Sequence, residues 1–355
     1  MKKLLLIFGG KSAEHDVSII SANSLLAGYS TNQYEIIPLK ISKTGKWILP
    51  EISVQDIREE LHQKLTIPKV NESELFSYLI NTIDVVFPLL HGTYGEDGTI
   101  QGFFEILGKP YVGAGVLGSA VGMDKGVAKL LLESNNIPVV PYVLTNETEF
   151  RANTESIVRK INETLKYPLF IKPCNSGSSI GITKVKSFAE LHNAVNFAFK
   201  YDQRILIESG LTVREIEISV LGNEKPEVSL PGEIHPAAEF YDYEDKYKTG
   251  ASWSEIPAKL DAATIKTIQL LASQTYQALC LNGFARVDFF IEPGTNAIYL
   301  NEVNTIPGFT PISMYPKMWE ASGLSYSALI DRLIQLAFEY HYKRQNIADN
   351  FQNLN

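Results

Sequence analysis

The segment Lys172-Pro-Cys-Asn-Ser-Gly-Ser-Ser-Ile-Gly181 places a lysine at the end of an apolar strand and a loop rich in glycine and serine directly after it. Glycine permits positive φ and a close backbone approach, so successive N–H groups of such a loop can turn toward phosphate oxygens. A P-loop is excluded, because its lysine follows the glycines and precedes Ser or Thr. The remaining alternatives are a phosphate-binding loop and a plain hairpin turn with a surface lysine.

Two strands in the last third of the chain carry side chains that suit a metal ion. One contains Arg286-Val-Asp288 and the next contains Glu302-Val-Asn304, and strand alternation puts both members of each pair on one face. Carboxylate and amide oxygens without nearby His or Cys favour Mg²⁺, which completes its shell with substrate phosphates and water. The carboxylates could instead be ordinary exposed strand residues. Their apolar neighbours indicate a buried setting, in which an unpaired charge is costly.

Length and composition limit the number of domains and the possible binding partners. A chain of 355 residues exceeds the usual size of a single hydrophobic core, so two or three domains are expected. Hydrophobic residues make up 45% and charged residues 20%, as in ordinary folded proteins. The net charge of −8, without any Lys/Arg-rich run, argues against nucleic acid as a partner. Phosphate must therefore be bound locally, by a few lysines, metal ions and backbone N–H groups.

Cysteine usage and hydropathy predict a soluble, cytoplasmic protein without a membrane partner. Cys174 and Cys280 are too few for a disulfide framework or a structural zinc site, and a reducing compartment fits. The apolar run 4–8 is short and meets Gly9-Gly10 at once, which is typical of a strand rather than a signal peptide. Nowhere does an apolar stretch reach the roughly 18 residues that a membrane span needs.

The pattern of elements predicts three domains of mixed α/β and α+β class. Residues 1–113 are expected to form an open parallel α/β domain, with strands at 2–8, 34–41 and 84–89 and a helix at 17–26.

Residues 114–208 are expected to form a small α+β domain with an antiparallel sheet. Its strands are predicted at 139–143, 169–172, 181–185 and 205–208, and its helices at 125–134, 155–165 and 189–199.

Residues 209–345 form the predicted third domain, and 346–355 a mobile tail. The strands of this domain are predicted at 215–221, 227–230, 285–291 and 297–303, and its helices at 263–279 and 326–340.

Single residues add weaker indications. Lys125 at a helix start and Lys246 in a polar, aromatic segment are candidates for phosphate contact, although each alone could be a solvated side chain. His91 lies where a strand gives way to a glycine-rich loop, a common place for site residues in open α/β sheets. A structural histidine with satisfied hydrogen bonds explains that position as well. Gly9-Gly10 lacks the full dinucleotide-binding pattern.

Taken together, six motifs make the chain resemble the D-alanine–D-alanine ligases, a family of the ATP-grasp superfamily, from Gly9 to about Leu336. The motifs are Gly9-Gly-Lys-Ser-Ala-Glu-His-Asp-Val-Ser18, His91-Gly-Thr-Tyr-Gly-Glu-Asp-Gly98, Met123-Asp-Lys125, the loop 172–181, Phe240-Tyr-Asp-Tyr-Glu-Asp-Lys-Tyr247 and Asn301-Glu-Val-Asn-Thr-Ile-Pro-Gly-Phe-Thr310. The resemblance implies an ATP-grasp fold of three domains.

The resemblance also implies a role for each matching residue. Glu14, linked through Ser178 to Tyr247, would receive the ammonium group of the first D-alanine and hold a movable loop closed. Arg286 and the Gly308 backbone would stabilise a tetrahedral oxyanion. His91 would lie beside the first substrate, while Ser313 and Met314 would lie at the second. The nucleotide contacts would be Lys125, Lys172, Ser179, Glu208, Glu215 and Lys246, and two Mg²⁺ ions, or Mn²⁺ in their place, would be held by Asp288, Glu302 and Asn304.

The reaction implied by the resemblance is the ATP-dependent joining of two D-alanine molecules through an acyl phosphate. ADP and phosphate would be released, and the dipeptide would serve peptidoglycan synthesis. A homodimer is implied as well, and the sequence of the lid at 240–247 is similar to the amide-forming rather than the ester-forming members. The alternatives are another ATP-grasp ligase or carboxylase acting on a different acid, and a catalytically silent nucleotide-binding module. Loss of Arg286 or of a metal ligand would mark a silent module, and this chain has all of these residues.

Overall fold

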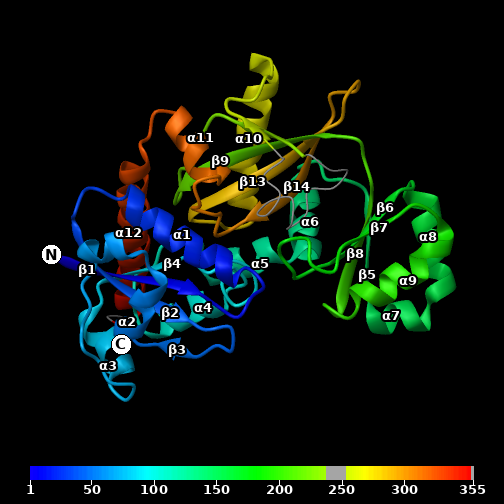
Figure 1. The fold of residues 1–355 in the computed structure, drawn as a ribbon. Coiled ribbons are helices and arrows are strands. Elements are labelled where there is room, and N and C mark those ends of the chain that lie inside the picture. The colour runs from blue at the N-terminus through cyan, green and yellow to red at the C-terminus, as the bar shows by residue number, and fades with distance from the viewer. Residues whose placement is uncertain (237–252, 353–355) are drawn as a thin grey trace.

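The computed structural model describes residues 1–236 and 253–352 and divides them among three β-sheets (Figure 1). The first sheet is built by the start of the chain, the second by its middle and the third by its last third. The mixed α/β and α+β architecture expected from the sequence is confirmed.

The first sheet is parallel except at one edge. Its order is β3 (Trp47–Ile48), β2 (Tyr34–Ile41), β1 (Lys2–Gly9) and β4 (Val85–Pro88). The central strand β1 runs parallel to both neighbours, and β3 adds an antiparallel hairpin edge. Leu4 and Leu6 pack into one core, whereas Leu5 and Ile7 pack into another, so the sheet is covered on both faces as a parallel sheet requires.

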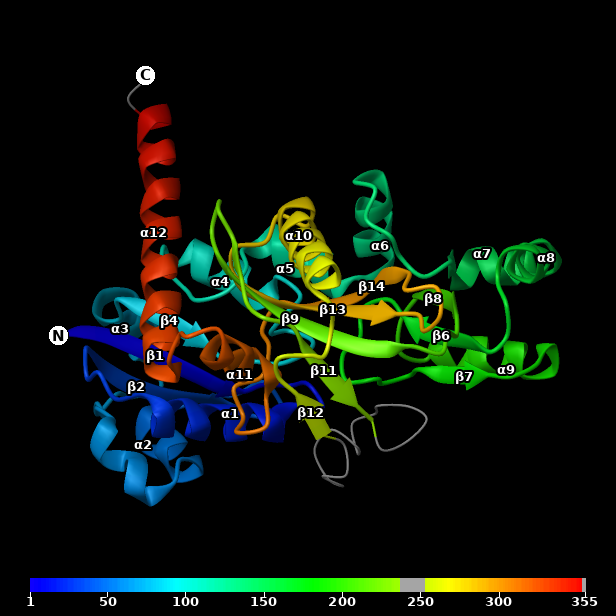
Figure 2. The same ribbon diagram turned by 90° about the horizontal axis from the view of Figure 1, so that it is seen from above.

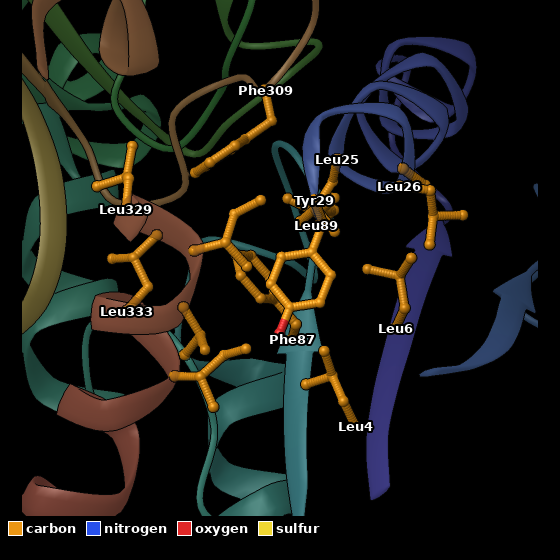
Figure 3. Packing of buried hydrophobic residues seen from close by; sticks show 14 of the residues in the cluster. Leu4, Leu6, Leu25, Leu26, Tyr29, Phe87, Leu89, Phe309, Leu329 and Leu333 are labelled. Atoms are coloured by element: carbon orange, nitrogen blue, oxygen red, sulfur yellow. The ribbon is translucent and has the colours of Figure 1, made fainter. Parts of the chain in front are cut away.

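Helices from both ends of the chain cover this sheet. They are α1 (His15–Gly28), α2 (Pro50–Ser53), α3 (Leu75–Thr82), α4 (Thr99–Ile106) and the C-terminal α12 (Tyr326–Gln352). Figure 3 shows Leu329 and Leu333 of α12 facing Leu4 and Phe87 of the sheet. The sequence groups α12 with the third sheet, and its apolar side in fact packs between the two sheets, because Leu221 and Phe284 of the third sheet belong to the same core.

The second sheet is small and antiparallel, as expected. Its order is β5 (Tyr142–Asn146), β8 (Arg204–Ser209), β6 (Leu169–Pro173) and β7 (Thr183–Val185), with α7 (Glu147–Ala152), α8 (Thr154–Thr164) and α9 (Phe188–Ala198) beside it. The strand expected at 139–143 begins later, at Tyr142. Pro138 and Pro141 lack the N–H that a regular ladder needs, and Val139 forms only an isolated bridge.

The third sheet separates an apolar face from a charged one. Its order is β12 (Trp253–Glu255), β11 (Gly232–His235), β9 (Arg214–Gly222), β13 (Gly283–Ile291) and β14 (Ile298–Asn304), and β10 (Glu227–Val228) pairs with β9. Ile216, Ile218 and Val287 enter a core shared with α10 (Ala262–Ala278), which lies over β9 and β13 in Figure 2. The alternate residues form the opposite, charged face.

Several helices differ from the expectation. The last one continues through most of the predicted mobile tail, to Gln352, because the sequence after Tyr340 contains neither Pro nor Gly and Arg344 pairs with Glu105. Others were not predicted: α4 and α5 (Val116–Met123) lie in a glycine-rich stretch, α7 is only six residues long, and α11 (Met314–Ala321) contains a proline in its first turn. In the described part of the chain, no helix is both long and apolar enough to cross a bilayer.

Candidate functional site

The charged face of the third sheet, the loop 172–181 and the first domain enclose one cavity of about 400 Å³. Eleven residues predicted from the sequence line it: Glu14, His91, Lys125, Ser178, Ser179, Arg286, Glu302, Asn304, Gly308, Ser313 and Met314. They come from segments nearly 300 residues apart, so the tertiary fold alone brings them together.

The loop that follows β6 is held to the start of α6 (Lys125–Ser134). Lys125 Nζ donates to the Ser176 carbonyl at 2.6 Å, and its backbone N–H donates to the Cys174 carbonyl at 2.9 Å. Ser178 and Ser179 both adopt left-handed backbone conformations, with φ of +49° and +59°. Consecutive turns of this kind occur where backbone N–H groups are aimed at an anion, and such strain in non-glycine residues is concentrated at functional sites.

Behind the loop lies a buried group of three charges. Glu208 on β8 forms ion pairs with both lysines: Oε1 lies 2.5 Å from Lys129 Nζ, and Oε2 lies 2.5 Å from Lys172 Nζ. Lys129 is only 3% exposed and also lines the cavity, which the sequence analysis did not anticipate. Its position four residues after Lys125 puts both lysines on one face of α6.

The two lysines control the charge of Glu208. Burial acts to raise the pKa of this carboxyl, but the adjacent ammonium groups outweigh it and lower the pKa to about 2. For Lys172, burial acts to lower the pKa, and Glu208 together with the nearby Glu302 and Glu215 raises it above its ordinary value. Burial lowers the pKa of Lys129, and the adjacent Glu208 opposes that shift. Glu208 therefore stays ionised at neutral pH, paired with Lys172 next to the loop.

On the third sheet, Arg286 holds Asp288 through two parallel hydrogen bonds of 2.8 and 2.7 Å. Its Nε also lies 3.1 Å from Glu217, which stands opposite Asp288 in the strand register. Burial acts to lower the pKa of Arg286, but these carboxylates raise it well above its ordinary value, so the guanidinium stays charged.

The predicted metal ligands form one cross-strand cluster. Asp288 pairs with Glu302, and Arg286 pairs with Asn304, in the β13–β14 register. The Asn304 amide nitrogen donates to Asp288 at 2.9 Å, which leaves its amide oxygen to bind a cation. Glu302 and Asn304 line the cavity, whereas Asp288 lies behind them in the ladder and is not part of the lining. Two carboxylates and one amide oxygen fit Mg²⁺ or Mn²⁺.

His91 lies in the wall of the cavity with both ring nitrogens engaged. Nδ1 donates to the Ile306 carbonyl at 2.9 Å, so Nε2 accepts from the Ser21 hydroxyl at 3.1 Å. Burial lowers the pKa of this imidazole although Glu14 opposes the shift, which favours the neutral ring. His91 is thus both a structurally satisfied histidine and a cavity residue.

Glu96 joins the same two loops and was not predicted. Its carboxylate accepts the backbone N–H groups of Gly92 and Ile306, each at 2.8 Å. Burial, aided by the charge of Glu14, raises the pKa of Glu96 to about 8. The quoted motif His91–Gly98 contains this residue, so the signal was present although no role was assigned to it.

Glu14, directly before α1, reaches the loop that follows β6. A methyl group built on Gly177 would lie 3.0 Å from Glu14 Oε2, and one built on Gly92 would lie 2.9 Å from the same atom. Glycine at both positions therefore lets the carboxylate approach the backbone beside Ser178. The third member of the predicted triad, Tyr247, lies outside the described residues, as does Lys246.

A tight turn places Gly308 against Ser313. A methyl group on Gly308 would lie 2.6 Å from Ser313 Oγ, and this oxygen also accepts the Thr310 N–H at 3.0 Å. Ser313 is the N-cap of α11, so the positive end of that helix dipole faces the same end of the cavity. Such a position suits a carboxylate.

Comparisons with known proteins find similar sequences along nearly the whole chain. Two family models match: "D-ala D-ala ligase N-terminus" over residues 3–114 and "D-ala D-ala ligase C-terminus" over residues 131–335. A D-alanine–D-alanine ligase of Clostridium acetobutylicum is 48% identical, with 95% of this chain and 98% of the relative aligned. Its counterpart in Caldicellulosiruptor bescii is 45% identical, with 97% of each aligned.

Two solved structures are also similar. The D-alanine-D-alanine ligase of Coxiella burnetii has a TM-score of 0.84 and 35% identity, covering 99% of this chain and 98% of its own. The VanG D-Ala:D-Ser ligase of Enterococcus faecalis has a TM-score of 0.79 and 39% identity, covering 95% and 99%.

Proposed function

Since this chain belongs to the D-alanine–D-alanine ligase family, we propose that it joins two D-alanine molecules, with ATP converted to ADP and phosphate, for peptidoglycan synthesis. The ATP-grasp fold and the ligase class expected from the sequence are confirmed by these relatives. The observation that carries the proposal is the single cavity, which combines nucleotide-type lysines, metal-type carboxylates and substrate-type residues.

At the nucleotide end, the proposal assigns phosphate contact to Lys125, Lys172 and the Ser178–Ser179 turn. Lys125 is already bonded to the loop, and Lys172 lies within the electrostatic reach of Glu302. Glu208 would act mainly by orienting Lys172, to which it is paired at 2.5 Å, and Glu215 also acts on that lysine. The direct contacts of Glu208 and Glu215 with adenine and ribose remain predictions.

Asp288, Glu302 and Asn304 would hold two Mg²⁺ ions. When bound, these ions would neutralise charge on the transferred phosphoryl group. The clustering of the three side chains supports this assignment, and the buried, charged Arg286 keeps Asp288 oriented.

A carboxylate is a poor electrophile, so phosphorylation of the first D-alanine would precede attack by the amine of the second. Arg286 and the Gly308 N–H would then stabilise the oxyanion, which develops only in the transition state. Glu14 and His91 would bind the first D-alanine, whereas Ser313 and the N-terminus of α11 would bind the carboxylate of the second.

Three further parts of the proposal rest on the resemblance. Lys246 and Tyr247 would complete the lid that excludes water from the acyl phosphate. The enzyme is expected to be a cytoplasmic homodimer. The division into domains 1–113, 114–208 and 209–345 also remains a prediction.

Product analysis tests the proposal directly. The enzyme would be supplied with ATP, Mg²⁺ and D-alanine, with D-serine and D-lactate as competing second substrates, because one similar structure is a D-Ala:D-Ser ligase. We expect D-alanyl-D-alanine as the main product, and phosphate release that depends on D-alanine. L-alanine is the matched control, because a site that fixes the substituents of the α-carbon should reject it.

The same experiment separates the rival functions. An ATP-grasp enzyme for another acid would release no phosphate with D-alanine. A silent module would bind ATP without turnover, although it retains Arg286 and all three metal ligands. Either result would overturn the assignment.

A further inference from the structure

We propose a second metal site, separate from the catalytic one, in which Glu233, His235 and Glu255 bind a divalent transition metal such as Zn²⁺. One nitrogen or oxygen atom from each residue lies within 4.8 Å of the others. His235 and Glu233 are on β11, and Glu255 is on the neighbouring β12.

The strand register concentrates negative charge at this point. Glu233 stands directly opposite Glu255 in the β11–β12 ladder, and like charges in such a pair are unfavourable without a cation. His235, two residues after Glu233, lies on the same face of β11. Its Nε2 lies 3.8 Å from Glu233 and 4.0 Å from Glu255, too far for a hydrogen bond to either.

His235 is oriented toward the gap by its neighbour. Its ring stacks on Trp253 with centroids 3.8 Å apart and an interplanar angle of 12°. Among the described residues, its buried Nε2 has no hydrogen-bond partner. An ion with bonds of about 2.1 Å to nitrogen and oxygen would fill the space between the three side chains after they contract by less than about 1 Å.

Two cations already neutralise the carboxylates in part. Arg214 forms two hydrogen bonds with Glu233, of 2.8 and 2.7 Å, and Lys259 lies 2.5 Å from Glu255. The Lys259 side chain is 82% exposed, so a metal ion can displace it at little cost. Arg214 can stay on Glu233, because each carboxylate oxygen accepts more than one partner.

The ligand set determines the class of ion. One imidazole and two carboxylates suit Zn²⁺, Co²⁺ or Mn²⁺, whereas Mg²⁺ prefers oxygen ligands and retains its water. Glu233 and His235 point to the opposite face of β11 from Ile234, which lines the catalytic cavity, although Trp253 beside His235 borders that cavity too. A bound ion would cross-link β11 to β12 next to the cavity wall.

Trp253 supplies a direct readout. The intact enzyme, in excess Mg²⁺, would be titrated with Co²⁺ while tryptophan emission and Co²⁺ absorption are recorded. Only three tryptophans occur in the chain, and Trp253 stacks on the proposed ligand, so Co²⁺ should quench its emission. We expect saturable binding of one ion that Mg²⁺ does not displace, and competition by Zn²⁺.

Variants decide whether the ion is at the proposed place. His235→Gln and Glu255→Gln should each weaken Co²⁺ binding by about tenfold or more, since each removes one of three protein ligands. His192→Gln, at an exposed histidine of α9, is the matched control and should bind as the wild type does. Glu302→Gln should leave this binding intact even if it abolishes ligation. Unchanged affinity in both ligand variants, or loss of the signal in Glu302→Gln, would refute the site.

Discussion

Replacing Lys129 by methionine should test whether the buried charges behind the nucleotide loop are coupled as the structure indicates. The Lys129 side chain is 3% exposed, and its ammonium group lies 2.5 Å from Glu208. Methionine keeps an unbranched chain of similar length and removes only the charge and the hydrogen bonds. The change therefore isolates the ion pair from the packing.

The lowered pKa of Glu208 gives the size of the expected change in the free energy of unfolding. A fall from 4.5 to about 2 corresponds to a favourable coupling of about 3 kcal/mol in the folded protein. Two lysines share this coupling, and Lys172 remains in the variant. We therefore expect Lys129→Met to lower the free energy of unfolding at pH 7 by about 1–2 kcal/mol, less than the cost of leaving a buried charge wholly unpaired.

The pH dependence gives a second readout with a definite sign. Because the pKa of Glu208 is lower in the folded state, its contribution is complete above pH 4.5 and is lost as the pH falls toward 2. In Lys129→Met this pKa should rise, so the acid-induced loss of stability should be smaller and should be complete at a higher pH.

Denaturant unfolding at a series of pH values measures both effects, and Lys160→Met on the exposed face of α8 is the control. The apparent affinity for ATP should weaken as well, because Lys172 would lose its orientation. If Lys129→Met and Lys160→Met unfold alike at every pH, the coupling through Glu208 is wrong.

Three further predictions concern the cavity. Glu302→Gln should weaken Mg²⁺ binding and lower turnover by about 100-fold or more, because a charged ligand is lost; near-normal activity at ordinary Mg²⁺ would remove Glu302 from the metal site. Tyr247→Phe should loosen the lid and raise the ratio of phosphate released to dipeptide formed, and an unchanged ratio would contradict the triad. Glu96→Gln should flatten the stability profile between pH 4.5 and 8, because burial raises the pKa of Glu96 to about 8 and the wild type loses stability as that carboxyl ionises; a profile matching the wild type in denaturant unfolding would exclude this role.

Local patterns in the sequence were sufficient to predict most of the elements. Residues 34–41 form the expected strand, and Lys125–Ser134 forms the expected helix. The period-two pattern also put Arg286 and Asp288 on one face, because alternation is a property of the extended backbone itself. The helix α5 was missed, since its glycines oppose helix formation locally and tertiary packing overrides them. The helix α11 was missed although proline in a first turn is compatible with a helix.

The sequence by itself determined which chemical groups the site contains, because motifs fix residue types and their spacing along a strand or loop. Only the tertiary structure decided what each group touches. Lys129 belongs to no motif in the sequence, yet folding buries it against Glu208. Glu96 binds the backbone of Ile306, which lies 210 residues further along the chain. Burial and long-range contacts depend on how the sheets pack rather than on neighbours in the chain. The pairing of charges around the cavity therefore could not be predicted from the sequence.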